Sequence, residues 1–202
     1  MSFRSELKTI LSYSKINLFN DWLNKNSGEI LYSERNINSI YYDNNLFQMY
    51  FDSIEGTVPR KKIRVRNYND SKQLQTLNNN LELKISSVEG RYKTVKKLTF
   101  FDLYNFSVND SIYGVCKPVI YVSYKRTYFK VKGFRLTLDK NIEYRKVYHN
   151  QISNSYFLEK NNIIEIKHTN PNNQKVNEIF PFTFYRFSKY CRGIEILYKI
   201  WF

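Results

Sequence analysis

The chain has few of the residues on which several common chemistries depend. Its 202 residues include two cysteines, Cys116 and Cys191, and two histidines, His149 and His168. Two distant cysteines form neither a disulfide framework nor the paired spacing of a zinc site. Isolated histidines give little support to histidine acid–base catalysis, and no Ser/His/Asp or Cys/His arrangement stands out. We expect Cys191, on the apolar face of a helix, to be a buried, inert thiol.

Long apolar runs are also absent. The apolar runs are far shorter than the roughly 20 residues that cross a bilayer, and the N-terminal residues lack the continuous apolar stretch of a signal peptide. These features predict a cytoplasmic protein without a transmembrane segment. No repeat, linker or domain boundary stands out, so a single domain over residues 1–202 is expected.

Aromatic residues and positive charge are plentiful. The chain has 18 Tyr and 15 Phe, and 25% of its residues are charged. This composition favours a folded, β-rich protein over a disordered one. A net charge of +14 costs self-repulsion in a compact state and therefore suggests a polyanionic partner. Nucleic acid, an anionic membrane and phosphorylated metabolites all meet that description.

Short segments with period-two alternation run through most of the chain, separated by Gly, Pro, Asn and Asp. Gly90 indicates a hairpin, and Gly133 indicates a second turn between strands. Three segments predict helices: one that follows Ser14 as N-cap, a second over 100–112, and a third over about 184–200. The predicted strands are 3–9, 38–43, 60–68, 80–87, 92–99, 119–129, 133–140 and 163–168.

Eight strands with few helices predict a mainly β (α+β) fold: an eight-stranded antiparallel barrel, closed or nearly closed, with peripheral helices. Closure removes the exposed strand edges that such a chain must otherwise protect.

The charged residues of five predicted strands share one face of their strand, because residues two apart point the same way. A solvated sheet face also alternates in this manner. However, rows of like charge are unfavourable unless a negative group lies between them. Arginine forks bind phosphate oxygens, and carboxylates hold a divalent metal, so the pattern favours a site for a metal-bound phosphate chain. The shared faces hold Arg4, Glu6 and Lys8; Arg60, Lys62, Arg64 and Arg66; Glu82 and Lys84; Arg135, Thr137 and Asp139; and Glu165 and Lys167.

Two positions do not follow this pattern. Arg126 lies on the alternation of Ile120, Val122 and Tyr124, which is an apolar set. Lys93 and Lys96 point to opposite faces if their strand is regular, so one of them is expected to be a surface lysine.

Nine short motifs, taken in order, resemble the catalytic domain of the vacuolar transporter chaperone (VTC) family, a member of the triphosphate tunnel metalloenzymes. The resemblance covers nearly the whole chain and implies an eight-stranded barrel with a polar tunnel. The motifs are RSELK (4–8), INSIYYDN (37–44), KIRVRNY (62–68), LELK (81–84), KTVK (93–96), YKRTYF (124–129), FRLTLD (134–139), IIEIK (163–167) and RFSKY (186–190).

The resemblance implies roles for individual residues. It implies Mn²⁺ or Mg²⁺ bound through Glu165, with Glu6 and Glu82 as further candidates, and it favours Lys96 over Lys93 as the inward lysine. Arg4, Lys62, Lys93 and Lys167 are additional substrate-binding candidates. The implied phosphate-binding groups are Lys8, Arg64, Arg66, Lys84, Lys96, Arg126, Arg135 and Lys189.

The first motif bears on the choice of reaction. Hydrolases of this fold carry E-x-E-x-K, whereas this chain has R-x-E-x-K with Arg4 at the leading position, similar to the VTC pattern. Loss of a carboxylate weakens the case for a second, water-activating metal. We therefore expect a polyphosphate polymerase that transfers the γ-phosphoryl of ATP to a growing chain. An inorganic triphosphatase or nucleoside triphosphatase of the same fold, and a non-catalytic polyanion or nucleic-acid binder, stay open as alternatives.

Overall fold

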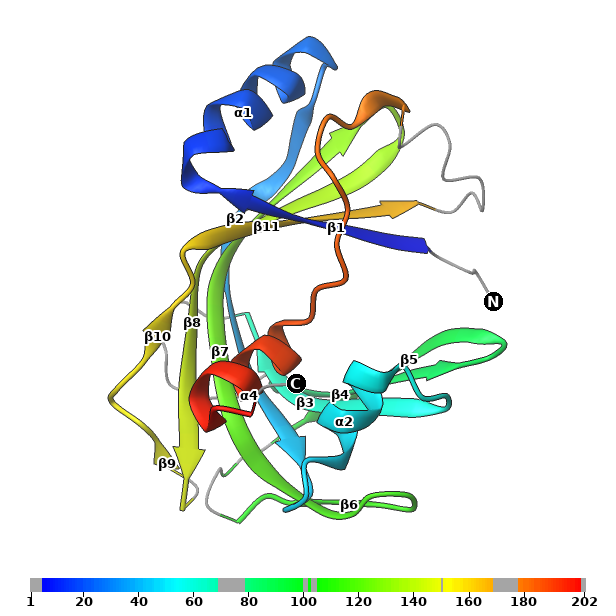
Figure 1. The fold of residues 1–202 in the computed structure, drawn as a ribbon, viewed down its shortest axis with the longest axis vertical. Helices are drawn as coiled ribbons and strands as arrows, with labels where there is room; N and C mark the ends of the chain where they lie inside the picture. The colour runs from blue at the N-terminus through cyan, green and yellow to red at the C-terminus, as the bar shows by residue number, and fades with distance from the viewer. Residues whose placement is uncertain are drawn as a thin grey trace. The chain divides into compact units, whose positions relative to one another are not determined.

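The computed structural model of the chain describes residues 5–68, 79–99, 102, 105–149, 151–168 and 178–200, and most of its elements are strands (Figure 1). The helices are α1 (Ile16–Lys25), preceded by the 3-10 turn η1 (Tyr13–Lys15), α2 (Gln48–Glu55) and α4 (Lys189–Tyr198). The strands are β1 (Ser5–Ser12), β2 (Glu29–Asp43), β3 (Arg60–Asn67), β4 (Asn79–Ser87), β5 (Gly90–Leu98), β6 (Val108–Asp110), β7 (Gly114–Val131), β8 (Phe134–Tyr148), β9 (Gln151–Ile152), β10 (Phe157–Leu158) and β11 (Asn161–His168).

The eight predicted strands are all present and form one path of hydrogen-bonded neighbours, β1-β11-β8-β7-β2-β3-β4-β5. The pairings β1–β11, β11–β8, β2–β3, β3–β4 and β4–β5 are antiparallel, which confirms the predicted fold class. The short strands β6, β9 and β10 pair beside this path and were not predicted. Within the described residues the path stays open, so the expected closure is wrong. The end strand β5 instead carries Arg91, Lys93, Lys96 and Lys97, and edge lysines oppose pairing with a further strand.

Internal contacts divide the chain into two compact units. The strands β2, β7 and β8 contribute residues to both, and the single domain expected over 1–202 stays a prediction. Unit 1 comprises residues 1–35, 124–142 and 159–187, and unit 2 comprises residues 36–123, 143–158 and 188–202.

Unit 1 has its apolar core on one face of β1, β11 and β8. Helix α1 buries Phe19 and Leu23 in this core. Trp22 donates its indole N–H to the carbonyl of Ile179 at 2.6 Å. Ser14 is not the N-cap: it lies in η1, where its hydroxyl bonds that of Ser12. The buried core residues are Leu11, Phe19, Leu23, Phe129, Val131, Leu136, Leu138, Ile164, Ile166 and Phe180.

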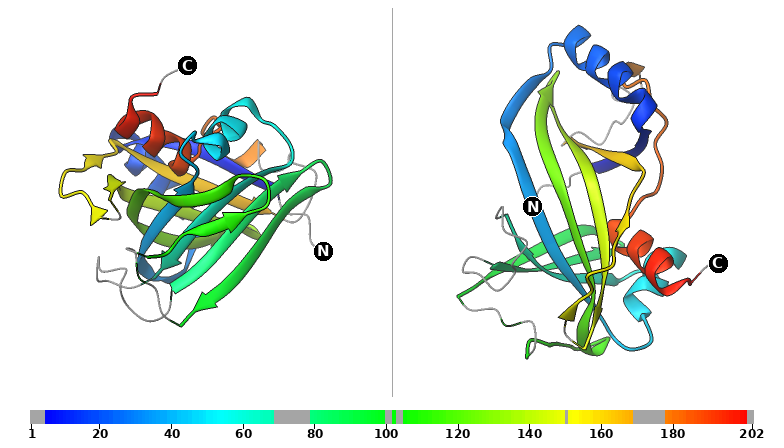
Figure 2. Two further views of the ribbon diagram at one scale, coloured as in Figure 1. Left: turned by 90° about the horizontal axis from the view of Figure 1, so that it is seen from below. Right: turned by 90° about the vertical axis from the view of Figure 1, so that its left-hand side faces the viewer.

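Unit 2 contains the antiparallel group β3, β4 and β5, whose strands lie side by side (cyan to green in Figure 2). The two hairpin predictions hold: Ser87 pairs with Gly90 between β4 and β5, and Gly133 has a φ of +83° at the turn from β7 into β8. A positive φ of this size is readily adopted by glycine.

The helices of unit 2 differ from the predictions. The structure adds α2, whose first turn is capped by Asp43: its carboxylate accepts N–H bonds from Met49 and Tyr50, each at 3.1 Å. Helix α4 begins several residues later than expected, because Ser188 is its N-cap and accepts a hydrogen bond from the Cys191 N–H. The helix expected over 100–112 is wrong where the structure describes that segment, since β6 occupies its end.

Two further expectations concern cysteines and membranes. Cys116 and Cys191 are both buried free thiols, and burial was predicted for Cys191. Burial raises the pKa of Cys116 to about 11, and the nearby carboxylates of Asp43 and Asp110 add to this rise. Among the described helices, none combines the length and apolar character needed to cross a membrane.

Gly193 allows α4 to approach β7 and β8 closely. A Cβ at this position would lie 2.6 Å from Cδ1 of Ile120 and 2.9 Å from Cδ1 of Tyr144. Both neighbours are fully buried and have little room to move. We predict that Gly193→Ala lowers the free energy of unfolding by about 1–3 kcal/mol through overpacking, measured by urea denaturation. Glu195→Ala, two residues along the same helix, should change it by less than about 1 kcal/mol; equal losses in both variants would contradict the packing argument.

Candidate functional site

In unit 2, the strand register gathers basic side chains on one face. Directly opposed residues of antiparallel strands share a face, and Tyr41 of β2 opposes Arg64 of β3, which opposes Glu82 of β4. The next row runs from Lys62 through Lys84 to Lys93. We call this set the β3–β4 basic face, and its charged members are Lys62, Arg64, Arg66, Glu82, Lys84 and Lys93.

Glu82 is a buried carboxylate of this face and is only 2% exposed. Its Oε2 accepts a hydrogen bond from Nε of Arg64 at 2.7 Å and lies 3.9 Å from Nη1 of Arg66. Its Oε1 accepts from the Lys93 ammonium at 2.5 Å. Burial alone would raise the pKa of Glu82, but these three cations lower it to about 2. Glu82 is therefore the internal counter-ion of the face, and its prediction as a metal ligand is not supported.

The register also decides between the two lysines of β5. Lys93 opposes Lys84 and contacts Glu82, whereas Lys96 opposes Leu81 on the other face of the sheet. The preference for Lys96 as the inward lysine was therefore wrong for this face. Regular alternation from the turn at Ser87 and Gly90 accounts for the difference.

Two hydroxyl groups hold the arginines of β3 in place. The hydroxyl of Tyr41 accepts a hydrogen bond from Nη1 of Arg64 at 3.0 Å, and that of Ser39 accepts from Nε of Arg66 at 3.0 Å. Burial would raise the pKa of Tyr41, but Arg64, Arg66 and Lys189 outweigh it, so that the pKa is lowered. A buried phenol with a lowered pKa indicates a strongly positive potential at this position.

The start of α4 adjoins the same face. The Lys62 ammonium donates to the hydroxyl of Ser188 at 2.9 Å and lies 3.8 Å from the sulfur of Cys191. The ring of Tyr190 stacks on that of Tyr41 at a centroid distance of 5.2 Å. Lys189 is the first residue of α4, so the structure brings it together with the predicted residues of β3.

Unit 1 has a second charged face, on the side of β1, β11 and β8 opposite the apolar core. One row runs from Glu6 through Lys167 to Arg135, and the next runs from Lys8 through Glu165 to Thr137. We call these six residues the β11 charged face. Nζ of Lys8 lies 3.1 Å from Oε1 of Glu6, and Nζ of Lys167 lies 3.0 Å from Oε1 of Glu165. Lys8 also donates to the carbonyl of Phe187 at 3.0 Å.

Arg126 is buried despite its apolar alternation, because Asp139 neutralises it. Its Nε and Nη2 donate to the two carboxylate oxygens of Asp139 at 2.5 and 2.7 Å. Burial would lower the pKa of Arg126, but Asp139 raises it well above its ordinary value. Cζ of Arg126 lies 5.2 Å from the ring centre of Tyr124. Cζ of Arg135 lies 5.2 Å from the ring centre of Tyr128.

Sequence reasoning missed several partners of the predicted residues. Asp139 shares its alternation with Arg135 and Thr137, and this was the available signal for it. Tyr41 and Ser39 lie in the matched motif INSIYYDN but carry no charge, so a search for charged residues passed over them. Arg4 lies outside the described residues.

The predicted metal ligands belong to both units. Glu82 lies in unit 2, while Glu6 and Glu165 lie on adjacent strands of unit 1. Within the described part of the chain, no group of three His, Cys, Asp or Glu side chains is placed to hold a metal ion. Mg²⁺ and similar cations are often held by one or two carboxylates together with substrate phosphates. Glu165 with Glu6 fits that arrangement, but not a complete protein cage.

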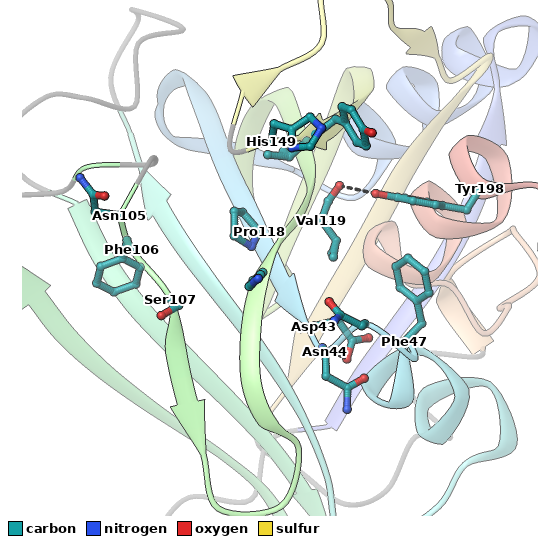
Figure 3. Close-up of a pocket in the computed structure, with 14 residues that line it drawn as sticks. Asp43, Asn44, Phe47, Asn105, Phe106, Ser107, Pro118, Val119, His149 and Tyr198 are labelled. Atoms are coloured by element: carbon teal, nitrogen blue, oxygen red, sulfur yellow. Dashed lines mark hydrogen bonds between the residues drawn. The ribbon is translucent and has the colours of Figure 1, made fainter.

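Unit 2 also contains an open cavity of about 670 Å³ at the C-terminal end of β2 (Figure 3). Aromatic and amide side chains line it, among them Asn44, Phe47, Phe106 and Tyr198, and the Tyr198 hydroxyl donates to the carbonyl of Val119 at 3.0 Å. None of the predicted site residues lines this cavity. Its lining is thus distinct from the β3–β4 basic face.

The described strands form one path of hydrogen-bonded neighbours, with arginines, lysines and carboxylates in rows on two faces. The VTC domain family matches residues 3–113 and 109–198. The match covers nearly the whole chain, and the chain belongs to this family.

Comparison with solved structures gives weaker likenesses. A conserved hypothetical protein from Pyrococcus furiosus is 14% identical, with a TM-score of 0.49 over 87% of this chain and 85% of that one. A putative adenylate cyclase from Vibrio parahaemolyticus is 12% identical, with a TM-score of 0.48 over 98% and 87%. The RNA triphosphatase Pct1 of S. pombe is 10% identical, with a TM-score of 0.36 over 98% and 82%. At these scores the likeness does not extend to function. No curated protein matches the chain.

The role of Glu82 as counter-ion predicts a specific acid sensitivity. The pKa of Glu82 is about 2 in the folded chain and 4.5 ordinarily, so its charge stabilises the fold above about pH 4.5, and this stabilisation is lost as pH falls towards 2. The shift corresponds to stabilisation on the order of 3 kcal/mol at neutral pH. We predict that Glu82→Gln lowers the free energy of unfolding at pH 7 and flattens its decline between pH 4.5 and 2.

Urea denaturation at pH 7, 5 and 3 measures this effect. Glu29→Gln, which removes an exposed carboxylate at the start of β2, is the matched control and should keep the wild-type pH profile. A Glu82→Gln profile parallel to that of the wild type would argue against the counter-ion role.

Proposed function

We propose that this protein is a metal-dependent polyphosphate polymerase, which transfers the γ-phosphoryl group of ATP to the end of a polyphosphate chain. The observation that carries the proposal is the buried pair Arg64 and Arg66, 8% and 5% exposed, in rows with three lysines and the carboxylate of Glu82. Membership of the VTC domain family agrees with a phosphate-chain substrate. Like charges on one face of a sheet repel one another unless a negative group lies between them, and a phosphate chain would supply such groups.

The residues of the β3–β4 basic face would bind the phosphate chain in two ways. Arg64 and Arg66, oriented by Tyr41, Ser39 and Glu82, would bind phosphate oxygens through their fixed forks. Such pre-oriented donors stabilise charge on a transferred phosphoryl group without reorganising during the reaction. Lys62, Lys84, Lys93 and Lys189 would hold the chain on the same face.

The β11 charged face would supply further phosphate ligands and the metal. Glu165, with Glu6, would hold Mn²⁺ or Mg²⁺, which offsets negative charge on the phosphates when bound. Lys8, Lys167, Arg126 and Arg135 would bind phosphate oxygens there, and Arg4 belongs to the same proposal. This function implies a cytoplasmic location, because the reaction needs ATP.

The reaction needs no strong protein base. The terminal oxygen of a phosphate chain is already anionic near neutral pH, so it attacks the γ-phosphorus directly. A new P–O bond forms to that oxygen, the bond to the β–γ bridging oxygen breaks, and ADP leaves with its electron pair. Catalysis then rests on in-line positioning and charge neutralisation, which suits a site of arginines, lysines and few carboxylates.

A nucleic-acid binder needs aromatic rings that are open for base stacking. The rings on the two charged faces do not meet this need: Tyr41, Tyr124 and Tyr128 are 6%, 4% and 6% exposed. Tyr41 stacks on Tyr190, and the other two contact arginines. The burial of these rings favours the phosphate-chain proposal over nucleic-acid binding.

The proposal predicts chain synthesis from ATP and Mn²⁺, detected as acid-labile polymer on a gel. Arg64→Lys, which keeps the charge but loses the fork, should lower the rate by about a hundredfold. Lys93→Ala should lower it by about tenfold through loss of one phosphate contact. Lys96→Ala, on the same strand but the opposite face, is the matched control and should stay near the wild-type rate.

The outcomes separate the candidates. Steady release of orthophosphate without polymer would replace the polymerase with a triphosphatase. Tight RNA binding without nucleotide turnover would replace both with a binding protein. Equal rates for Lys93→Ala and Lys96→Ala would remove the β3–β4 basic face from the reaction.

A further inference from the structure

Thr137, on the β11 charged face, has a buried hydroxyl for which the described residues provide no partner. The residue is 2% exposed and lies in the middle of β8. Its Oγ1 makes no hydrogen bond within the described structure. A buried hydroxyl without a partner is unfavourable compared with an apolar group of the same shape. Valine has that shape and an equal preference for strands, so the fold alone gives no reason for a hydroxyl here.

Thr9 is a buried threonine with a structural hydrogen bond and can be compared with Thr137. It is 1% exposed and lies on the apolar face of β1, opposite Ile164. Its hydroxyl donates to the carbonyl of Thr183 at 3.0 Å. The two threonines are similarly buried in unit 1, but among the described residues only the Thr9 hydroxyl has a hydrogen-bond partner.

The neighbours of Thr137 indicate what its hydroxyl binds. Glu165 lies directly opposite on β11, and Cβ atoms of such a pair are about 5 Å apart. A hydroxyl oxygen beside a carboxylate offers two hard oxygen donors, the type that Mg²⁺ and Mn²⁺ prefer. A phosphate in the same place would be repelled by Glu165.

We propose that the Thr137 hydroxyl is a further ligand, beside the Glu165 carboxylate, of a divalent cation of the Mg²⁺ or Mn²⁺ type. The hydroxyl contributes a lone pair and keeps its proton, so no bond in the protein is made or broken. Lys167, at 3.0 Å from Glu165 and with a side chain 33% exposed, holds the carboxylate when the cation is absent and has room to swing into solvent. This inference rests on the metal site of the proposed function and adds a residue that charge alone did not indicate.

The test is a titration of the full chain with Mn²⁺ alone, in which free Mn²⁺ is followed by electron paramagnetic resonance. Thr137→Val should weaken Mn²⁺ binding by about tenfold, and Thr137→Ser, which restores the hydroxyl, should recover most of it. Glu165→Gln should weaken binding further. Without metal, the Tm of Thr137→Val should equal or exceed that of the wild type, because the substitution removes an unsatisfied group.

Thr9→Val is the matched control. It should lower the Tm by about 5 °C, because it removes a satisfied hydrogen bond, and leave Mn²⁺ binding unchanged. Mn²⁺ affinity of Thr137→Val equal to that of the wild type, with loss in Glu165→Gln, would overturn the role of Thr137 and leave the proposed metal site intact. A Tm loss in Thr137→Val like that of Thr9→Val would identify a structural hydroxyl and overturn it as well.

Two further outcomes concern the ligand itself. Weaker binding of tripolyphosphate to Thr137→Val in the presence of EDTA, with unchanged Mn²⁺ affinity, would assign the hydroxyl to phosphate and overturn the cation. Absence of Mn²⁺ binding by the wild type would remove this inference together with the metal of the proposed function, while polymer synthesis would still test the phosphate-binding faces.

Discussion

The contact between Arg64 and Glu82 is the interaction on which the organisation of unit 2 depends. Arg64 is a buried cation, and a buried cation without a counter-ion is strongly destabilising. Glu82 supplies that counter-ion at 2.7 Å and also holds Lys93. The hydroxyl of Tyr41 accepts a further hydrogen bond from the guanidinium and fixes its orientation. The side chains of three strands are therefore oriented around one carboxylate before any substrate arrives.

In unit 1, a second buried arginine is also compensated by a single carboxylate. Arg126 is buried between tyrosines, and Asp139, which is fully buried, takes two hydrogen bonds from it. The pairing of a buried guanidinium with a single carboxylate thus occurs in both units. In each case nearby basic side chains, such as Lys93 and Arg135, are more exposed than the buried arginine. Each unit therefore combines a fixed cation with others that have more freedom to follow a flexible ligand.

The period-two pattern was sufficient to predict the eight strands of the path and the sharing of a face by Arg64 and Arg66. It was not sufficient to choose between Lys93 and Lys96, because that choice depends on the register between β4 and β5, which is fixed by the turn at Ser87 and Gly90. The ion pair between Asp139 and Arg126 could not be predicted for a related reason: Arg126 lies thirteen positions away on another strand. The role of Glu82 depends on three side chains from two other strands, and no local pattern reports such a contact.

Helix α2 was not predicted because its formation depends on tertiary contacts. Eight residues are too few for an isolated helix to be stable in water, and its first N–H groups are bonded by Asp43, which belongs to β2. The same carboxylate accepts a hydrogen bond from the hydroxyl of Tyr190 in α4. One aspartate thus fastens two helices to the end of a strand, so the three segments acquire their structure cooperatively and neither helix is an independent folding unit.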